Sequence, residues 1–369
     1  MKSTTWFDLS LPGSTWRRGQ LRWMMQDLAG VARQPEHDPR THVRATLEWL
    51  CRAQDACDSE QDNGRASAGW TFESGWQPNC IDTTGWLVET LLPAARYLTW
   101  PALEIRARTM LEALKIHSGE PSAGQIHGLI AGYVQFGDAG YLEQAVRQAH
   151  VLRELPVQPV VHCAQIAYAL GTLSVASRDE NLARSARQYL DTVLACQTPC
   201  GWFAESGVPT STVALTSTLR SLIEMGVIMG DRRALHAARN AAHALRECMH
   251  AEGWLAGAYD DGWMPAASHA CLSGLVQMAT CWLRLSQLEH NELWRDAAWR
   301  ALAWIKRNQR TEGEGDPALR DALPNSVPIW RGANAFGFDA MNAKYFADAL
   351  MMDMVGAAIP PNVRKMEFE

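Results

Sequence analysis

The chain has 369 residues, of which 47% are hydrophobic and 20% are charged, so it can bury a large core and is too apolar to be disordered. Its formal net charge of −6 disfavours a nucleic-acid partner or an anionic membrane surface. The longest uncharged runs, residues 160–176 and 267–283, contain His, Gln, Ser and Thr. They therefore predict buried core helices rather than membrane spans.

The nine cysteines do not form the pattern of a small disulfide scaffold in a chain of this size. The first residues carry one lysine but no apolar run typical of a secretory signal. We therefore expect free thiols and a cytoplasmic location. Glycine-rich phosphate loops and dinucleotide fingerprints are missing, so no cofactor is predicted.

Residues 1–38 predict an N-terminal arm, with a short amphipathic segment at 20–31 between prolines. From Pro39 two classes of segment alternate. The first class is charged and amphipathic, with one apolar face and one solvated face: residues 42–53, 103–116, 141–155, 182–195, 232–249 and 292–308. The second class has few or no charges: residues 84–97, 124–136, 160–176, 212–225, 268–285 and 342–355.

A helix that is apolar nearly all round must be enclosed by other helices. Six charged helices alternating with six nearly chargeless ones therefore predict an all-α fold, an (α/α)6 toroid with an outer and an inner ring. Strand signals are nearly absent, and no linker divides the chain. Residues 39–369 are predicted to form this single domain, whose inner helices surround a central cavity.

The stretch from Glu73 to Trp86 delivers polar and aromatic groups to one end of the first inner helix. Gly75 and Pro78 predict a loop. A helix is expected to start near Gly85, capped by Asp82 or by one of the two threonines after it. This loop would place two carboxylates and two indoles at the cavity mouth, namely Glu73, Asp82, Trp76 and Trp86.

Sixteen tryptophans are an unusual load, and several follow a glycine in loops before the predicted inner helices: Trp70, Trp76, Trp202, Trp254 and Trp263. One interpretation is that the glycine makes a sharp turn and the indole packs over the helix junction. The other is that an indole face stacks on a ligand such as a sugar. Trp76, Trp86 and Trp263 are the candidates for the second role.

Several segments occur in an order that resembles six-hairpin-glycosidase-like toroid proteins of bacterial exopolysaccharide biosynthesis loci, and more distantly the squalene-cyclase and prenyltransferase toroids. They are Asp82-Thr-Thr-Gly-Trp, Ala123-Gly-Gln-Ile-His-Gly-Leu, Gln197 with Gly201-Trp-Phe, Leu219-Arg-Ser-Leu-Ile-Glu, Cys271-Leu-Ser-Gly-Leu-Val-Gln, Asn325-Ser-Val-Pro-Ile and Asn342-Ala-Lys-Tyr-Phe-Ala-Asp. The resemblance covers residues 40–355 and implies a carbohydrate-related role with polysaccharide-synthesis proteins as partners.

The chain departs from these families at three places. A His-Thr pair expected before the fourth inner helix is Thr210-Ser-Thr-Val here, and a Thr-Gly-Gln is Ala123-Gly-Gln. Terpenoid cyclases protonate an alkene with the middle Asp of Asp-x-Asp-Asp-Thr. Ile81 stands at that position, and an isoleucine cannot donate a proton, so terpenoid cyclisation is disfavoured.

Carboxylates at one cavity mouth could divide into a general acid and a base or nucleophile, as glycoside hydrolysis requires. The catalytic candidates are Asp82, Glu73, Asp260 and His269. The binding candidates are Trp76, Trp86, Tyr259, Asp261, Trp263, His162, His127 and Asp339. The alternative is a solvated rim of loop carboxylates and histidines that belong to the core.

The sequence thus predicts a carbohydrate-active or carbohydrate-binding protein, with glycoside hydrolysis by paired carboxylates as the first hypothesis and an oligosaccharide or polysaccharide fragment as ligand. A uronate lyase or epimerase using His269 or Tyr259 is a second hypothesis. A non-catalytic glycan-binding scaffold is a third. A zinc site from Cys200, His162-Cys163 and His269-Ala-Cys271 is disfavoured because no paired metal-ligand spacing occurs.

Overall fold

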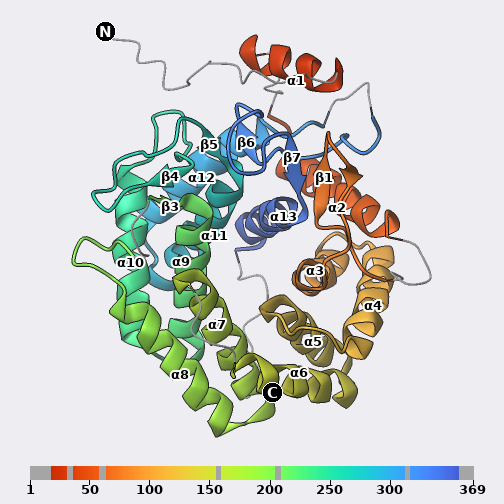
Figure 1. Cartoon of the computed structure of the whole chain (residues 1–369), viewed down its shortest axis with the longest axis vertical. Coiled ribbons are helices and arrows are strands. Elements are labelled where there is room, and N and C mark those ends of the chain that lie inside the picture. The colour runs from red at the N-terminus through yellow and green to blue at the C-terminus, as the bar shows by residue number, and fades with distance from the viewer. Residues whose placement is uncertain are drawn as a thin grey trace.

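The computed structural model describes residues 18–30, 36–57, 64–154, 159–203, 209–311 and 316–356. Twelve of its helices form a closed double ring, which confirms the predicted toroid (Figure 1). The outer helices are α2 (Pro39–Asp55), α4 (Pro101–Ile116), α6 (Ala139–Leu152), α8 (Glu180–Ala195), α10 (Arg232–Glu247) and α12 (Glu292–Lys306). The inner helices are α3 (Ile81–Tyr97), α5 (Ala123–Phe136), α7 (Val160–Ser177), α9 (Thr212–Ile228), α11 (Leu272–Glu289) and α13 (Ala340–Val355).

The ring closes because each inner helix packs on the next one and α13 returns to pack on both α3 and α2. Outer helices bury only one stripe. In α10 the buried side chains recur at helical spacing, and they are Ala234, Ala237, Ala238, Ala241, Ala242 and Leu245. In α11 every residue from Gly274 to Leu285 is buried, as expected for a helix enclosed on all sides.

The two faces of the ring differ in their connections. The inner helices α3, α5, α7, α9 and α11 are each joined to the following outer helix by only two or three residues, as at 98–100 or 137–138. Longer segments such as 248–271 and 307–339 lead back into the inner helices. We call the side that holds the N-termini of the inner helices the long-loop face, and the opposite side the short-loop face.

Short strands tie the long loops together, where the sequence analysis expected loops alone. They are β1 (Gly69–Thr71), β2 (Gly75–Trp76), β3 (Thr210–Ser211), β4 (Ala258–Tyr259), β5 (Ala270–Cys271), β6 (Ser326–Val327) and β7 (Gly337–Asp339). Antiparallel pairing gives a sheet of order β2-β1-β7 and the two pairs β3-β4 and β5-β6. Gly69 lies opposite Asp339, and a Cβ at position 69 would come within 2.3 Å of the Phe338 carbonyl oxygen. The first and last repeats therefore meet edge to edge.

The predicted start and cap of the first inner helix were wrong. Helix α3 begins at Ile81, four residues before Gly85, and its N-cap is Cys80, which makes no side-chain capping bond. The Thr84 hydroxyl instead donates to the Cys80 carbonyl at 2.7 Å and accepts from the Ala66 amide at 3.0 Å. The start of α11 also differs from the prediction, since strand β5 displaces it to Leu272.

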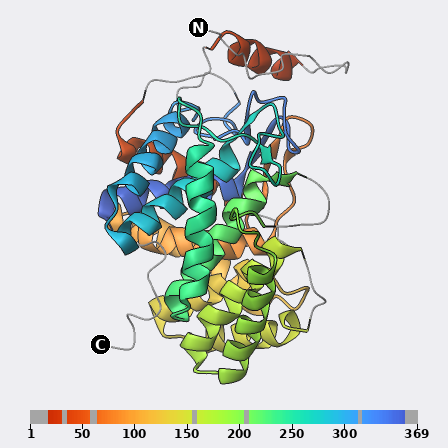
Figure 2. The same cartoon turned by 90° about the vertical axis from the view of Figure 1, so that its left-hand side faces the viewer.

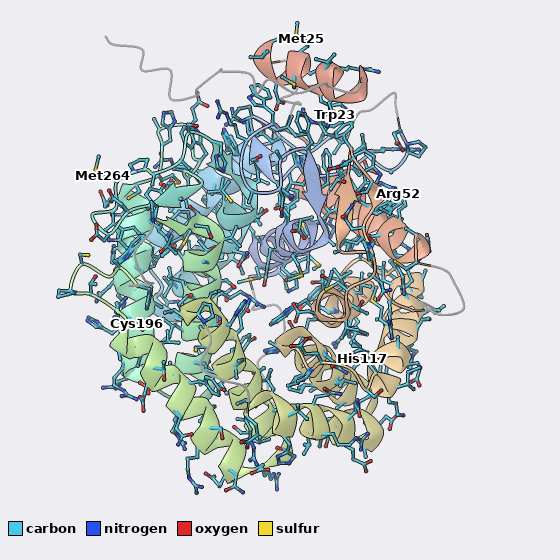
Figure 3. The ribbon with its side chains drawn as sticks, in the orientation of Figure 1. Trp23, Met25, Arg52, His117, Cys196 and Met264 are labelled. Atoms are coloured by element: carbon cyan, nitrogen blue, oxygen red, sulfur yellow. The ribbon has the colours of Figure 1, made fainter. Side chains whose placement is uncertain are left out.

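Helix α1 (Arg18–Leu28) lies at the outer edge of the ring in both views (Figures 1 and 2). Trp23 points from α1 toward the toroid and Met25 points away (Figure 3). The Trp23 ring packs against Phe72 and Phe338, with centroids 5.8 and 5.5 Å apart. The Asp27 carboxylate accepts a 2.9 Å bond from the Ile329 amide, so α1 is fixed to the long-loop face.

All nine cysteines lie in the described residues, and none of them is in a disulfide bond. One described helix, Val160–Ser177, is long and apolar enough to span a membrane by length and composition, and 67% of it is buried inside the ring. This burial is what a core helix requires.

Candidate functional site

Asp82 links two inner helices at the long-loop face. It lies on the first turn of α3, half-buried, and its Oδ1 accepts a 2.8 Å bond from the Gly124 amide at the start of α5. A Cβ at position 124 would come within 2.2 Å of the Asp82 carbonyl oxygen, so glycine is required for this close approach. The carboxylate sits beside the free amides of the α5 N-terminus, where negative charge is stabilised.

The loop of Asp260 is held mainly by its own backbone. The Asp260 carboxylate accepts bonds from the amides of Gly262 at 3.0 Å and Met264 at 2.8 Å, which closes a tight turn. Asp261 is exposed.

Two aromatic residues flank this turn. The Tyr259 side chain is fully buried, its hydroxyl accepts a 2.9 Å bond from the Ala256 amide, and burial raises its pKa. Trp263 has a left-handed φ of 63° and donates its indole N–H to the Cys200 carbonyl at 3.0 Å. Its ring meets Trp202 edge-on at 5.1 Å. Both side chains stabilise the loop.

The two other predicted aromatic residues pack against rings of the protein itself. Trp76 packs against Trp49 of the outer helix α2, with centroids 5.4 Å apart. Trp86 is 2% exposed and stacks on His127 inside the ring, with centroids 4.5 Å apart.

The histidines predicted at the mouth occupy different environments. His162 is exposed on the first turn of α7. His269 is half-buried and lies against the backbone of two glycines; a Cβ on Gly257 would come within 2.2 Å of its Nε2, and one on Gly332 within 3.0 Å. Burial and the nearby Arg331 lower the pKa of His269.

Glu73 and Asp339 share a groove at the rim of the long-loop face. It encloses about 990 Å³ including its open side and runs between the β1–β2 hairpin and the segment 325–339, with Gln20 of α1 at its edge. Its remaining lining combines aromatic rings with amide side chains: Trp70, Phe72, Phe336, Phe338, Gln77, Asn325 and Asn334. The groove therefore offers both apolar faces and hydrogen-bonding groups.

The two carboxyl groups of this groove differ in environment. Glu73 is exposed in the hairpin turn. Asp339 is the N-cap of α13, where it accepts a 3.0 Å bond from the Met341 amide. Burial raises the pKa of Asp339, and the Met341 bond offsets only part of that rise. The groove therefore combines one carboxyl group whose pKa burial raises with one that is exposed to solvent.

A second group of ionisable side chains, not predicted from the sequence, fills the centre of the ring. Glu89 on α3 is 4% exposed, and its Oε1 lies 3.1 Å from His127 Nδ1 on α5. Its Oε2 lies 3.9 Å from Arg220 and 4.0 Å from Lys344. Burial alone would raise the pKa of Glu89, but His127, Lys344 and Arg220 outweigh it and lower that pKa.

The two cations of this central network have further partners. Lys344 Nζ donates to Asp348 at 2.5 Å, and Asp348 also accepts from the Thr90 hydroxyl at 2.8 Å. The Arg220 guanidinium lies over the ring of Trp86 at 5.0 Å, and Lys344 lies over the same ring at 5.6 Å. The buried charges are therefore all compensated, as buried charges must be.

The sequence did carry a signal for this network, because each of its charges stands nearly alone in an otherwise apolar inner helix. Arg220 and Glu224 belong to the segment Leu219-Arg-Ser-Leu-Ile-Glu, and Lys344 and Asp348 to the segment Asn342-Ala-Lys-Tyr-Phe-Ala-Asp. A lone charge in an enclosed helix must be paired inside the ring. His127 was predicted at the mouth, but it lies on the second turn of α5, in the interior.

No group of three or more His, Cys, Asp or Glu side chains within the described residues could hold a metal ion. The thiols of the disfavoured zinc hypothesis point elsewhere. Cys200 contacts Thr198 and the Asp261 carbonyl, while Cys271 accepts a bond from the Gly274 amide as the N-cap of α11.

No family model matches the chain, and no curated protein matches its sequence. The fold matches solved structures of unsaturated glucuronyl hydrolases. The enzyme from Bacillus sp. GL1, described as responsible for glycosaminoglycan degradation, is 12% identical at a TM-score of 0.71, with 88% of this chain and 99% of that chain covered.

Two further neighbours have the same 12% identity. An unsaturated glucuronyl hydrolase specific for heparin matches at a TM-score of 0.70, with 87% of this chain and 98% of that chain covered. A variant from Streptococcus agalactiae, complexed with dGlcA-GalNAc6S, matches at 0.67 over 86% of this chain and 95% of that one. At this identity the likeness establishes the shared (α/α)6 toroid.

Proposed function

We propose that the chain is a carbohydrate-active protein of the glycoside hydrolase type that binds an oligosaccharide in the groove of Glu73 and Asp339. The observation that carries the proposal is the pair of carboxyl groups in one groove, Glu73 exposed to solvent and Asp339 with a pKa that burial raises. The likeness of the whole toroid to glycan-cleaving enzymes supports it. Membership of a polysaccharide-synthesis locus and a cytoplasmic location stay predictions.

The two carboxyl groups suit the two proton transfers of glycoside hydrolysis. Asp339, whose pKa burial raises, donates its proton to the glycosidic oxygen as the bond to the leaving sugar breaks. Glu73, which is exposed to solvent, takes a proton from the water that attacks the anomeric carbon. Phe72, the half-buried aromatic ring of the lining, offers apolar surface to a sugar ring, and Asn325 and Asn334 offer amides for sugar hydroxyls.

Hydrolysis by Asp82 with Asp260 fits the geometry less well, because neither carboxylate lines this groove. The lyase or epimerase hypothesis is also less supported. The Tyr259 hydroxyl is fully buried and bonded to Ala256, so it would have to leave that bond to act as a base.

The test is turnover of dGlcA-GalNAc6S and of a panel of neutral p-nitrophenyl glycosides by the full chain. Asp339→Asn keeps the helix cap, because Asn caps as well as Asp, but it cannot donate the proton. We expect Asp339→Asn and Glu73→Gln each to lower kcat by about 100-fold or more with little change in melting temperature. Full activity in both variants would overturn the assignment.

The matched control is Asp179→Asn. Asp179 caps α8 by accepting bonds from Asn181 and Leu182, at the short-loop face and away from the groove. This variant should keep wild-type turnover. If no glycan is cleaved but one is bound, and Glu73→Gln weakens that binding, the non-catalytic glycan-binding hypothesis replaces hydrolysis.

A further inference from the structure

The short-loop face contains a pocket that the proposed hydrolysis does not use. It lies among α3, α5, α7 and α9 and encloses about 640 Å³ including the open space at its mouth. Its walls are mostly aliphatic and come from the C-terminal halves of these helices: Leu92, Pro93, Ile130, Ala131, Val134 and Ile228. Arg96 and Gln135, joined by a 3.0 Å hydrogen bond, also line it.

The other lining residues include the acidic end of the central network. Glu89 and His127 are 4% and 1% exposed. Glu89 Oε2 and His127 Nε2 are both buried, and neither has a hydrogen-bond partner among the residues that the structure describes. Leaving a buried polar atom unsatisfied costs about 1–3 kcal/mol, and two such atoms belong to residues that line this pocket, where a ligand could supply the missing bonds.

The charges in the depth of the pocket disfavour an ionic ligand. Glu89 is compensated by Arg220 and Lys344, and Glu224 is held by Arg284, whose Nε donates to it at 2.8 Å. No lining carboxylate is therefore left with an uncompensated charge, and Arg96 is exposed to solvent. An ammonium or carboxylate head group in the interior would lose its hydration without gaining a counter-ion.

Neutral hydroxyl groups suit the two buried atoms that lack hydrogen-bond partners, Glu89 Oε2 and His127 Nε2. His127 Nδ1 lies 3.1 Å from the Glu89 carboxylate and donates to it, which leaves Nε2 as the ring nitrogen without a partner. Glu89 Oε2 is an acceptor. A hydroxyl group can donate to Oε2, and a hydroxyl group can donate to or accept from a ring nitrogen, so two hydroxyls on one molecule satisfy both atoms, while the aliphatic walls match a hydrocarbon chain.

We propose that the short-loop pocket binds a neutral molecule with a polyol head and an aliphatic chain, the chemistry of an alkyl glycoside. The head group bonds Glu89 and His127, and the chain lies along Leu92, Ile130 and Val134. This site is separate from the groove of Asp339, since the two open at opposite ends of the inner helices.

The test is isothermal titration of the full chain with three probes: n-octyl β-D-glucoside below its micelle-forming concentration, glucose and octanoate. We expect one site that prefers octyl glucoside over both other probes by at least 10-fold. Ala131→Phe fills the pocket and should weaken octyl glucoside binding by 10-fold or more. The control Ala102→Phe, at an exposed position of outer helix α4, should leave binding unchanged.

Two further variants distinguish binding at this site from binding in the groove and from nonspecific hydrophobic binding. Glu89→Gln keeps the shape but adds a donor where an acceptor is needed, so it should also weaken binding if it folds. Asp339→Asn should leave octyl glucoside binding unchanged even if it abolishes glycan turnover. Equal or tighter binding of octanoate, or octyl glucoside binding that survives Ala131→Phe, would overturn the proposal.

Discussion

Acidic side chains at the long-loop face and in the centre of the ring are held in different ways. At the face, Asp82, Asp260 and Asp339 each accept bonds from backbone amides. In the centre, Glu89 and Asp348 are surrounded by the side-chain cations Arg220 and Lys344. An amide bond needs only an acceptor oxygen, whereas a buried cation needs a negative charge. An acidic side chain at the face can therefore be replaced by a neutral side chain that keeps an acceptor oxygen. In the centre of the ring the negative charge itself is required.

Among the substitutions that test this comparison, a change at Glu89 is expected to have the largest effect on stability. Glu89→Ala leaves Arg220 and Lys344 short of one counter-charge and His127 without its acceptor, in a fully buried place. Removing one partner of a buried ion pair costs about 3–5 kcal/mol. We expect a loss of that size in the free energy of unfolding, measured with denaturant.

Glu89→Gln is the matched control, because it preserves volume and one acceptor oxygen but removes the charge. It should also destabilise the fold strongly. If Glu89→Gln were as stable as the wild-type chain, the central network would not depend on charge, and the contrast between the two regions would fail.

A smaller effect is expected at Asp82. Asp82→Asn keeps an oxygen that can accept from the Gly124 amide, so its stability should change little. Asp82→Ala loses the bond and should cost about 1 kcal/mol, the usual value for a lost helix-terminal acceptor. Melting temperatures and turnover measured on the same preparations check both roles. If Asp82→Asn lost turnover by orders of magnitude at unchanged stability, Asp82 would be a catalytic residue, as the sequence suggested.

The toroid could be predicted because its cause is visible in the composition of each segment. An enclosed helix such as α11 excludes charge on every side, and an outer helix such as α10 excludes it on one. The start of α3 could not be predicted, because two candidate caps, Asp82 and Thr84, bond elsewhere: one to Gly124 of the next inner helix, the other to Cys80 and Ala66. Capping propensities describe local bonds only.

The candidate site was predicted in part. Glu73 and Asp339 were both selected, but their meeting in one groove depends on the pairing of β1 with β7, and these strands are more than 260 residues apart in the chain. The sequence analysis did not predict the central network, because it described the inner helices by their apolar residues and assigned no role to their few charges. The spacing of Lys344 and Asp348, four residues apart on one face of a buried helix, was the available signal.

The smallest expected effect concerns the pH dependence of stability at two aspartates that cap helices. Burial raises the pKa of Asp339, so its contribution favours folding below its unfolded pKa and is lost as the pH rises through the folded value. Asp339→Asn removes this titration and keeps the cap. The stability of the variant relative to the wild-type chain should therefore increase as the pH rises from about 3 to 7.

For Asp231, the N-cap of α10, the expected pH dependence of stability has the opposite sign. The Arg233 side chain, with the backbone bonds of the cap, lowers the pKa of Asp231, so its contribution is present above the unfolded pKa and is lost as the pH falls through the folded value. Over the same pH range Asp231→Asn should lose stability relative to the wild-type chain, by a small amount because the pair is exposed to solvent. Melting curves of the three proteins across this range decide the matter. If both variants moved in the same direction, the burial of Asp339 would not control its ionisation, and Asp339 would lose its support as the proton donor of the groove.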